Sequence, residues 1–304
     1  MAADRADIDP TPASGVACAF LAFLIWGLSP IYWKTLQHVP AVEIILHRVV
    51  WSFAFLMPLV VVGRQWPAFK AAATTPKTLG ILFITAILVG VNWLIYIWAV
   101  NNGRVLQASL GYYINPLVNV LLGMVFLRER LRPAQTVAVG LAALGVFNLT
   151  FRYGAFPWVS LSLAFSFGLY GLVRKVAAVG PLVGLTVETL LLTVPAGIWM
   201  VHLNRIGSGA FLSTGVATDL LLLGTGILTS TPLLLFNLGA KRITLTTLGL
   251  VQYTAPTGML LLGITLFDEP FTTAQAITFG LIWTALALYS WDSLRVHRTA
   301  GVKG

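Results

Sequence analysis

The chain has 304 residues, of which 58% are hydrophobic and only 10% are charged, and its formal net charge is +9. A soluble domain carries about 25% charged residues, so this composition excludes a water-soluble globular protein and indicates a polytopic membrane protein. The basic residues stand singly or in pairs between apolar runs, which is not the pattern of a nucleic-acid-binding protein, and one cysteine, Cys18, excludes an internal disulfide and a cysteine-based metal cluster.

Ten apolar stretches are predicted to be membrane-spanning helices, because a helix needs about 20 mostly apolar residues to cross the bilayer. Residues 1–15 are predicted to form a disordered tail, without the basic region of a cleavable signal peptide, and residues 293–304 a second tail. The links between the spans are too short for a soluble domain. The predicted spans are 16–33, 42–62, 79–100, 105–127, 134–150, 157–173, 183–203, 217–237, 245–266 and 272–291.

The basic residues divide unequally between the two sides of the predicted bundle. If the N-terminus is cytoplasmic, the cytoplasmic segments hold 14 Lys and Arg and the opposite side holds 4, with one further arginine inside a span. Positive residues accumulate in cytoplasmic loops of membrane proteins. Both termini are therefore predicted to be cytoplasmic.

The chain also repeats itself. Residues 106–140 align with 246–280 at a constant offset of 140, and the earlier parts of the halves align more weakly. The predicted repeats are 16–150 and 157–292, each with five spans. Because five is odd, the second repeat enters the membrane from the opposite side, and inverted repeats are typical of secondary transporters. The matched pairs are Leu110/Leu250, Tyr113/Tyr253, Pro116/Pro256, Leu121/Leu261, Leu122/Leu262, Gly123/Gly263, Glu129/Glu269, Ala134/Ala274, Gln135/Gln275 and Gly140/Gly280.

Two acids of this repeat are predicted to cap helices. Glu129 and Glu269 each precede a span, the fifth and the tenth, and a carboxylate is stabilised near a helix N-terminus by the helix dipole. A role for either acid in transport is the alternative that we favour less.

Ionisable residues inside spans are costly and therefore mark functional sites by default. The second span holds Glu43, His47 and Arg48, and the seventh holds Glu188, which aligns with His47 at an offset of 141. Such residues facing one cavity would bind an anionic group or relay a proton. The structural alternative is a Glu–His or Glu–Arg pair that fixes the helix, with side chains that extend toward the membrane interface.

Further polar residues lie beside the mid-span prolines Pro116 and Pro256, and Asn92 lies in the third span. These residues would line a substrate path. For any one aromatic residue among them, packing is the favoured interpretation. The complete predicted substrate or coupling cavity comprises Glu43, His47, Arg48, Asn92, Tyr113, Asn115, Glu188, Gln252 and Tyr253.

Several strings in the chain resemble the drug/metabolite transporter superfamily, built from two EamA-type domains, and more narrowly its RarD branch. They include Phe126-Leu-Arg-Glu-Arg130, Trp26-Gly-Leu-Ser-Pro-Ile-Tyr-Trp-Lys34, Glu43-Ile-Ile-Leu-His-Arg-Val-Val-Trp-Ser52, Asn92-Trp-Leu-Ile-Tyr-Ile-Trp98 and Gln252-Tyr-Thr-Ala-Pro256. The resemblance covers nearly the whole chain. It implies an inner-membrane permease linked to export of drugs or metabolites, although fold does not determine substrate.

These observations predict an all-α integral membrane protein that moves a small metabolite or drug-like molecule across the inner membrane by alternating access, with proton coupling left open. No phosphate-binding loop and no metal-ligand or nucleophile motif occurs in the sequence, so we expect no cofactor, no metal and no enzymatic activity. The expected partners are the substrate and the bilayer, and a homodimer is left open. The alternatives are a non-transporting membrane partner or sensor and, less favoured, a membrane-embedded enzyme.

Overall fold

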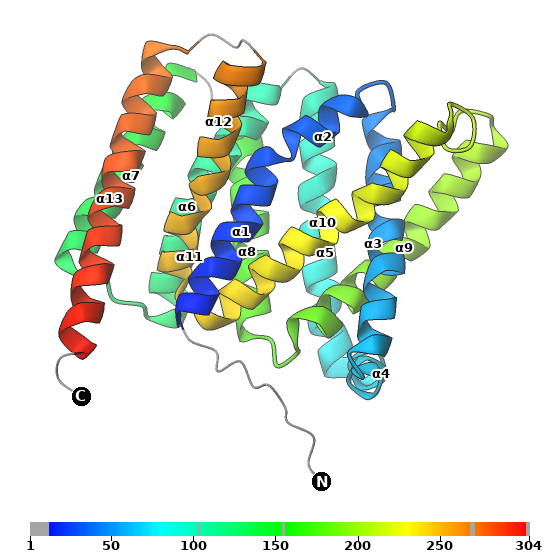
Figure 1. Ribbon diagram of the computed structural model, residues 1–304, viewed down its shortest axis with the longest axis horizontal. Helices are drawn as coiled ribbons and strands as arrows, with labels where there is room; N and C mark the ends of the chain where they lie inside the picture. The colour runs from blue at the N-terminus through cyan, green and yellow to red at the C-terminus, as the bar shows by residue number, and fades with distance from the viewer. Residues whose placement is uncertain (1–11, 103, 154–155, 268–270, 302–304) are drawn as a thin grey trace.

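A computed structural model describes residues 12–102, 104–153, 156–267 and 271–301. In these residues the chain forms a bundle of helices, most of which run between two opposite ends of the molecule (Figure 1). The helices are α1 (Pro12–Leu28), α2 (Pro30–Thr35), α3 (Ala41–Val62), α4 (Trp66–Thr74), α5 (Pro76–Asn101), α6 (Val105–Leu127), α7 (Pro133–Tyr153), α8 (Trp158–Val176), α9 (Pro181–Arg205), α10 (Val216–Arg242), α11 (Leu245–Gln252), α12 (Thr254–Leu266) and α13 (Thr273–Gly301).

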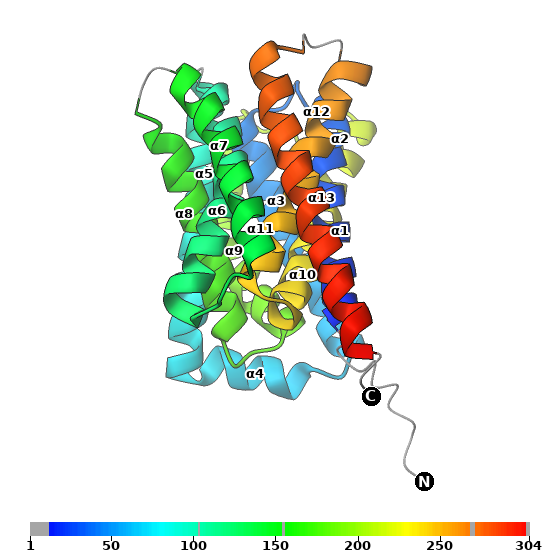
Figure 2. The same ribbon diagram turned by 90° about the vertical axis from the view of Figure 1, so that its left-hand side faces the viewer.

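The two ends of the bundle differ in what they hold. α1 begins and α13 ends at one of them, and α4 lies there too (Figures 1 and 2). We call this end the terminal face and the opposite end the distal face. The α6–α7 link, which carries Arg128, Arg130 and Arg132, is also at the terminal face. The structure thus gathers basic links that the sequence analysis placed together on one side.

Nine segments of the described chain are long and apolar enough to cross a membrane, and they coincide with the first nine predicted spans. The tenth predicted span lies in α13, which has 29 residues but is less apolar than the others. The predicted helix boundaries were too narrow at both ends of the chain. α1 begins inside the predicted tail, at Pro12, since proline fits the first turn of a helix, and α13 continues into the predicted second tail as far as Gly301.

Two of the spans are broken helices, and proline accounts for both breaks. Proline has no N–H to donate to the carbonyl four residues earlier, and its ring clashes with that carbonyl. Upstream of Pro30, the carbonyl of Trp26 instead accepts the Ser29 hydroxyl at 2.8 Å. Upstream of Pro256, the affected carbonyl is that of Gln252, where α11 ends. The first and ninth predicted spans are each one candidate membrane span in the structure, divided at the proline.

The short helix α4 was not predicted. It lies across the terminal face, nearly perpendicular to the spans (Figure 2). Its apolar residues follow helical spacing: Phe69 and Ala72 are buried, and the ring of Trp66 stacks on Phe69 with centroids 5.4 Å apart. A tryptophan-containing amphipathic helix suits a position at the membrane interface.

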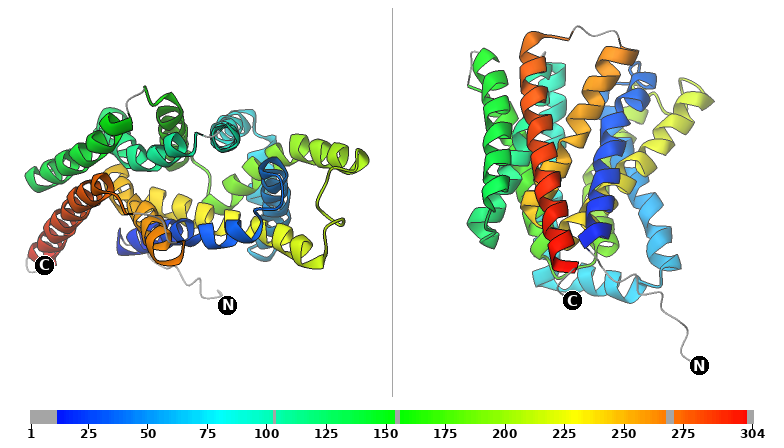
Figure 3. Two further views of the ribbon diagram at one scale, coloured as in Figure 1. Left: turned by 90° about the horizontal axis from the view of Figure 1, so that it is seen from above. Right: turned by 60° about the vertical axis from the view of Figure 1, so that its left-hand side comes forward.

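The spans pack through small residues and a shared apolar core. α6 packs on α8, α1 on α10, and α3 on both α9 and α10. Where α1 crosses α12, a Cβ on Gly258 would lie 3.2 Å from the Cα of Gly27, so glycine permits this close approach. α7 and α13 form a separate pair at one edge of the bundle (Figure 3), joined at the terminal face by an Arg132–Asp292 ion pair of 2.5 Å.

Candidate functional site

Arg48 lies in α3, about 10 Å along the helix from its distal end at a rise of 1.5 Å per residue. Its guanidinium carbon is 4.9 Å from the ring centroid of Trp33 and 5.1 Å from that of Trp93. Its Nε donates a hydrogen bond of 3.0 Å to the Thr229 hydroxyl of α10. We call Trp33, Trp93 and Thr229 the Arg48 cage. Residues from α2, α3, α5 and α10 therefore meet around one cation.

No carboxylate of the described chain lies within 4.0 Å of the Arg48 guanidinium. Indole faces attract a cation through their quadrupole, but they do not neutralise its charge. Tyr96 and Tyr112 lie close enough to Arg48 to interact with its charge, and their two rings pack edge to face against each other. Each of these two residues is more than a third exposed. Arg48 itself is half-buried. The site therefore holds a positive charge that no carboxylate of the described residues neutralises.

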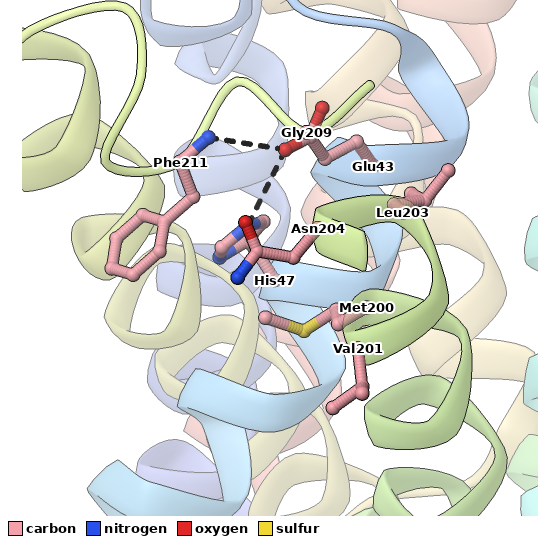
Figure 4. A pocket seen from close by; sticks show the side chains of 8 residues that line it. All are labelled: Glu43, His47, Met200, Val201, Leu203, Asn204, Gly209 and Phe211. Carbon is pink, nitrogen blue, oxygen red and sulfur yellow. Dashed lines mark hydrogen bonds and ion pairs between the residues drawn. The ribbon is translucent and has the colours of Figure 1, made fainter. Parts of the chain in front are cut away.

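Glu43 and His47 face a different region from Arg48. Both line a cavity of about 150 Å³ near the distal face, between α3, the end of α9 and the α9–α10 link (Figure 4). Glu43 Oε1 accepts backbone N–H bonds from Ala210 at 2.7 Å and Phe211 at 3.2 Å. The other oxygen, Oε2, is buried without a partner. Glu43 therefore anchors the α9–α10 link, and Arg48 is not among the residues that line this cavity.

The hydrogen bonds of His47 fix its tautomer. Its Nδ1 accepts a bond of 2.8 Å from the indole N–H of Trp51, which can only donate. Nδ1 is therefore unprotonated, and the ring proton of the neutral tautomer lies on Nε2, which is 3.8 Å from Glu43 Oε1. The ring also contacts Phe211 with centroids 4.9 Å apart. In this arrangement His47 is a packed, hydrogen-bonded residue of the distal pocket.

Glu188 forms a buried ion pair with Arg174 near the terminal face. Nε of Arg174 is 3.4 Å from Oε1 of Glu188, and the side chains are 0% and 1% exposed. The hydroxyl of Thr85 donates to Oε1 at 2.6 Å, and that of Tyr170 donates to Oε2 at 3.3 Å. Gly184 faces the guanidinium, and a Cβ there would overlap it. Because α9 begins at the terminal face and α3 at the distal face, Glu188 and His47 lie toward opposite ends of the bundle, and Glu188 does not line the cavity that His47 lines.

Two lysines join α8 and α10 beside this ion pair. Lys175 Nζ donates to the carbonyl of Ala240 at 2.8 Å, and also to that of Ile243, at the end of α10. Lys241 donates to the carbonyl of Ala177 at 2.6 Å, just past the end of α8. Each lysine thus satisfies free carbonyls at the C-terminus of the other helix, where a cation is favoured. This region of the terminal face is closed by charge-assisted bonds.

The predicted amide residues make hydrogen bonds between helices. Gln252 Nε2 donates to Asn115 Oδ1 at 2.6 Å, and Asn119 Nδ2 donates to Gln252 Oε1 at 2.8 Å, so the three amides link α6 to α11. Tyr253 donates to the Tyr113 carbonyl at 3.2 Å. In the third span, Asn92 donates to the Leu163 carbonyl and the Ser166 hydroxyl, both at 2.9 Å.

Glu129 binds a helix N-terminus, but not that of the helix that follows it. Its Oε1 accepts the backbone N–H of Leu245 at 2.7 Å, and its Oε2 accepts the N–H of Thr246 at 2.9 Å and the hydroxyl of the same residue at 2.7 Å. These groups belong to the first turn of α11, so the carboxylate joins the two halves. The prediction that Glu129 caps the fifth span is corrected accordingly. Glu269 lies outside the described residues.

Some residues of these clusters were absent from the predicted site. Arg174 was counted as a loop charge because the predicted sixth span ended at residue 173, although α8 continues to Val176. Thr229 has no distinguishing sequence signal, because α10 contains several threonines. Trp33 and Trp93 stand in the resemblance strings quoted above, and aromatic residues near an intramembrane arginine were the available signal. No cluster of three His, Cys, Asp or Glu suited to a metal occurs in the described part of the chain.

Comparisons with known proteins bear on this arrangement. Residues 13–151 match the EamA-like transporter family. Protein RarD of Escherichia coli (strain K12) is 44% identical over 93% of this chain and 96% of its own length. The chain belongs to the EamA family. Two further relatives of this EamA chain are the uncharacterized transporter YojE of Bacillus subtilis (strain 168), at 45% identity over 94% of this chain and 96% of YojE, and the chloramphenicol-sensitive protein RarD of Pseudomonas aeruginosa, at 32% over 95% and 98%.

A solved crystal structure supports the same fold. It superposes with a TM-score of 0.71 over 91% of this chain and 97% of the other, at 20% sequence identity. At that identity the likeness concerns the fold alone. The relatives therefore place this EamA protein among RarD-type membrane transporters. Its substrate class has to be inferred from the residues of the site.

Proposed function

We propose that the protein is a secondary transporter that carries a small molecule across the inner membrane by alternating access, with the Arg48 cage as its substrate-binding centre. The observation that carries this proposal is the unneutralised guanidinium of Arg48 within a span. An intramembrane charge is costly, and structural charges are normally paired. Arg174 follows that rule through Glu188, whereas Arg48 does not. An arginine without a counter-ion from the protein suits a substrate-binding residue, because the substrate can supply the negative charge.

The distribution of polar contacts supports a path that is closed toward the terminal face. The Arg174–Glu188 pair, the lysine bonds between α8 and α10, and the Glu129 bonds to α11 all lie on that side of the Arg48 cage. We infer that these contacts form one gate and that they separate in the opposite state. The Glu43 bonds to the α9–α10 link would form the corresponding contact at the distal face.

Helix directions support the inverted repeat. α6 runs from the distal to the terminal face, whereas its sequence counterpart, α11 with α12, runs the opposite way (Figure 1). Two similar units in opposite orientation can supply two arrangements of similar energy, each open to one side. The excess of basic residues on the terminal face favours a cytoplasmic position for both termini.

Flux in proteoliposomes tests the transport function. Purified protein is reconstituted and presented with a library of amino acids, organic acids, amines and small neutral antibiotics, with and without an imposed pH gradient. We expect saturable flux of at least one class above that of protein-free liposomes, and acceleration by the gradient if Glu188 or Glu43 carries a coupled proton. A complete absence of protein-dependent flux, with protein shown to be folded and inserted, would reject the transporter proposal.

A further inference from the structure

We propose that the transported molecule is an organic monoanion with a carboxylate group and an apolar body, and that Arg48 binds its carboxylate. This inference rests on the proposed transport function and specifies its substrate class. It depends on three features of the Arg48 cage: the free side of the guanidinium, the single charge, and the aromatic walls.

The hydrogen bonding of Arg48 leaves one side of the guanidinium available. Nε is engaged by Thr229 at 3.0 Å, which orients the planar group and directs its two terminal nitrogens away from that bond. Two parallel N–H groups of a guanidinium match the two oxygens of a carboxylate. The geometry therefore suits end-on, bidentate binding, and Thr229 acts as a positioning residue.

The charge of the cage favours a monoanion over a phosphate. Arg48 is the cation of this cluster, and the neighbouring Lys34 is directed onto the ring of Phe267, with its Nζ 4.0 Å from the ring centroid. One guanidinium neutralises one carboxylate. A phosphate dianion would bring an uncompensated negative charge into a low-dielectric site, which is strongly unfavourable.

The walls of the cage favour an apolar body. The indoles of Trp33 and Trp93 flank the guanidinium, and the rings of Tyr96 and Tyr112 lie nearby with more than a third of each side chain exposed. Flat aromatic faces bury a large apolar area and pack well against rings or chains. The cage thus combines one guanidinium, which can bind an anion, with apolar aromatic surfaces beside it.

A matched ligand series tests this assignment on the purified full-length protein. Binding of 3-phenylpropanoate, 3-phenylpropanamide and 3-phenylpropyl phosphate is measured by calorimetry and by quenching of tryptophan fluorescence. We expect the carboxylate to bind at least about tenfold more tightly than the amide or the phosphate, a ratio that corresponds to about 1.4 kcal/mol. In Arg48→Gln this preference should disappear. Lys34→Gln removes a nearby charge outside the cage and should retain it.

The outcomes separate this inference from the transport proposal. Equal affinity for the carboxylate and the amide, or a carboxylate preference that survives in Arg48→Gln, would overturn the substrate class. So would protein-dependent flux confined to neutral or cationic compounds, although transport itself would then stand. Tightest binding of the phosphate would replace the carboxylate by a phosphate-bearing substrate.

Discussion

Replacement of Arg174 by methionine is expected to lower the free energy of unfolding by about 3–5 kcal/mol, because removal of one partner from a buried ion pair leaves an uncompensated charge. Glu188 would then keep only the hydroxyl bonds from Thr85 and Tyr170, and it is 1% exposed. The bonds of Arg174 to Asn237 and to the Pro181 carbonyl would also be lost. Thermal and denaturant unfolding in detergent measure the effect.

Two further variants establish that the loss comes from the unpaired charge. Arg174→Met combined with Glu188→Leu removes both charges and should recover most of the stability, since a buried ion pair replaced by apolar groups is often neutral. Arg130→Met removes an exposed arginine of the α6–α7 link and should change stability by less than about 0.5 kcal/mol. A double variant as unstable as Arg174→Met alone would contradict this explanation.

Replacement of Arg48 by glutamine is expected to reduce transport by about 100-fold, or about 2.7 kcal/mol of binding free energy, while the protein remains folded. Glutamine keeps a hydrogen-bond donor near Thr229 but lacks the positive charge and the paired N–H groups that bind a carboxylate through both oxygens. Loss of one partner from a buried, hydrogen-bonded charge pair typically costs about 2–5 kcal/mol of affinity. Initial rates of flux in proteoliposomes, for a substrate identified with the unaltered protein, measure the change.

The melting temperature of Arg48→Gln distinguishes a binding defect from a folding defect. Arg48 has no carboxylate partner in the described chain, so its removal leaves no buried charge behind and should shift the unfolding free energy by no more than about 1 kcal/mol. Arg48→Lys retains the charge without the fork and should transport at an intermediate rate. Undiminished flux in well-folded Arg48→Gln would remove Arg48 from the substrate site.

The nine spans found in the described residues were predictable because the length of an apolar run is a local property of the sequence. The breaks in the first and ninth spans had a local signal too, in Pro30 and Pro256, but a proline does not always break a helix: Pro116 lies inside the continuous α6. Sequence reasoning could therefore locate the candidate break points without selecting among them.

The partners of the intramembrane charges were not predictable, because helix packing determines them. Glu129 was expected to cap the next helix, yet it binds Leu245 and Thr246, more than 100 residues later. Glu188 was expected to face the same cavity as His47, and in the structure it forms an ion pair with Arg174 of α8. Arg48 was selected as a candidate from the cost of an intramembrane charge, which depends on the residue and its span and not on helix packing.

Two-sided labelling of a single cysteine tests alternating access most directly. Tyr112 packs against Tyr96 beside the Arg48 cage, is 37% exposed, and lies about 10 Å from the distal end of α6 at 1.5 Å per residue. Tyr112→Cys in a Cys18→Ser background is treated with a membrane-impermeant maleimide from either side of the membrane. Alternating access predicts labelling mainly from the distal side, and a shift toward the terminal side when Arg174→Met and Glu188→Leu weaken the gate. Labelling from one side only in both backgrounds, or undiminished labelling from both sides at once, would contradict it.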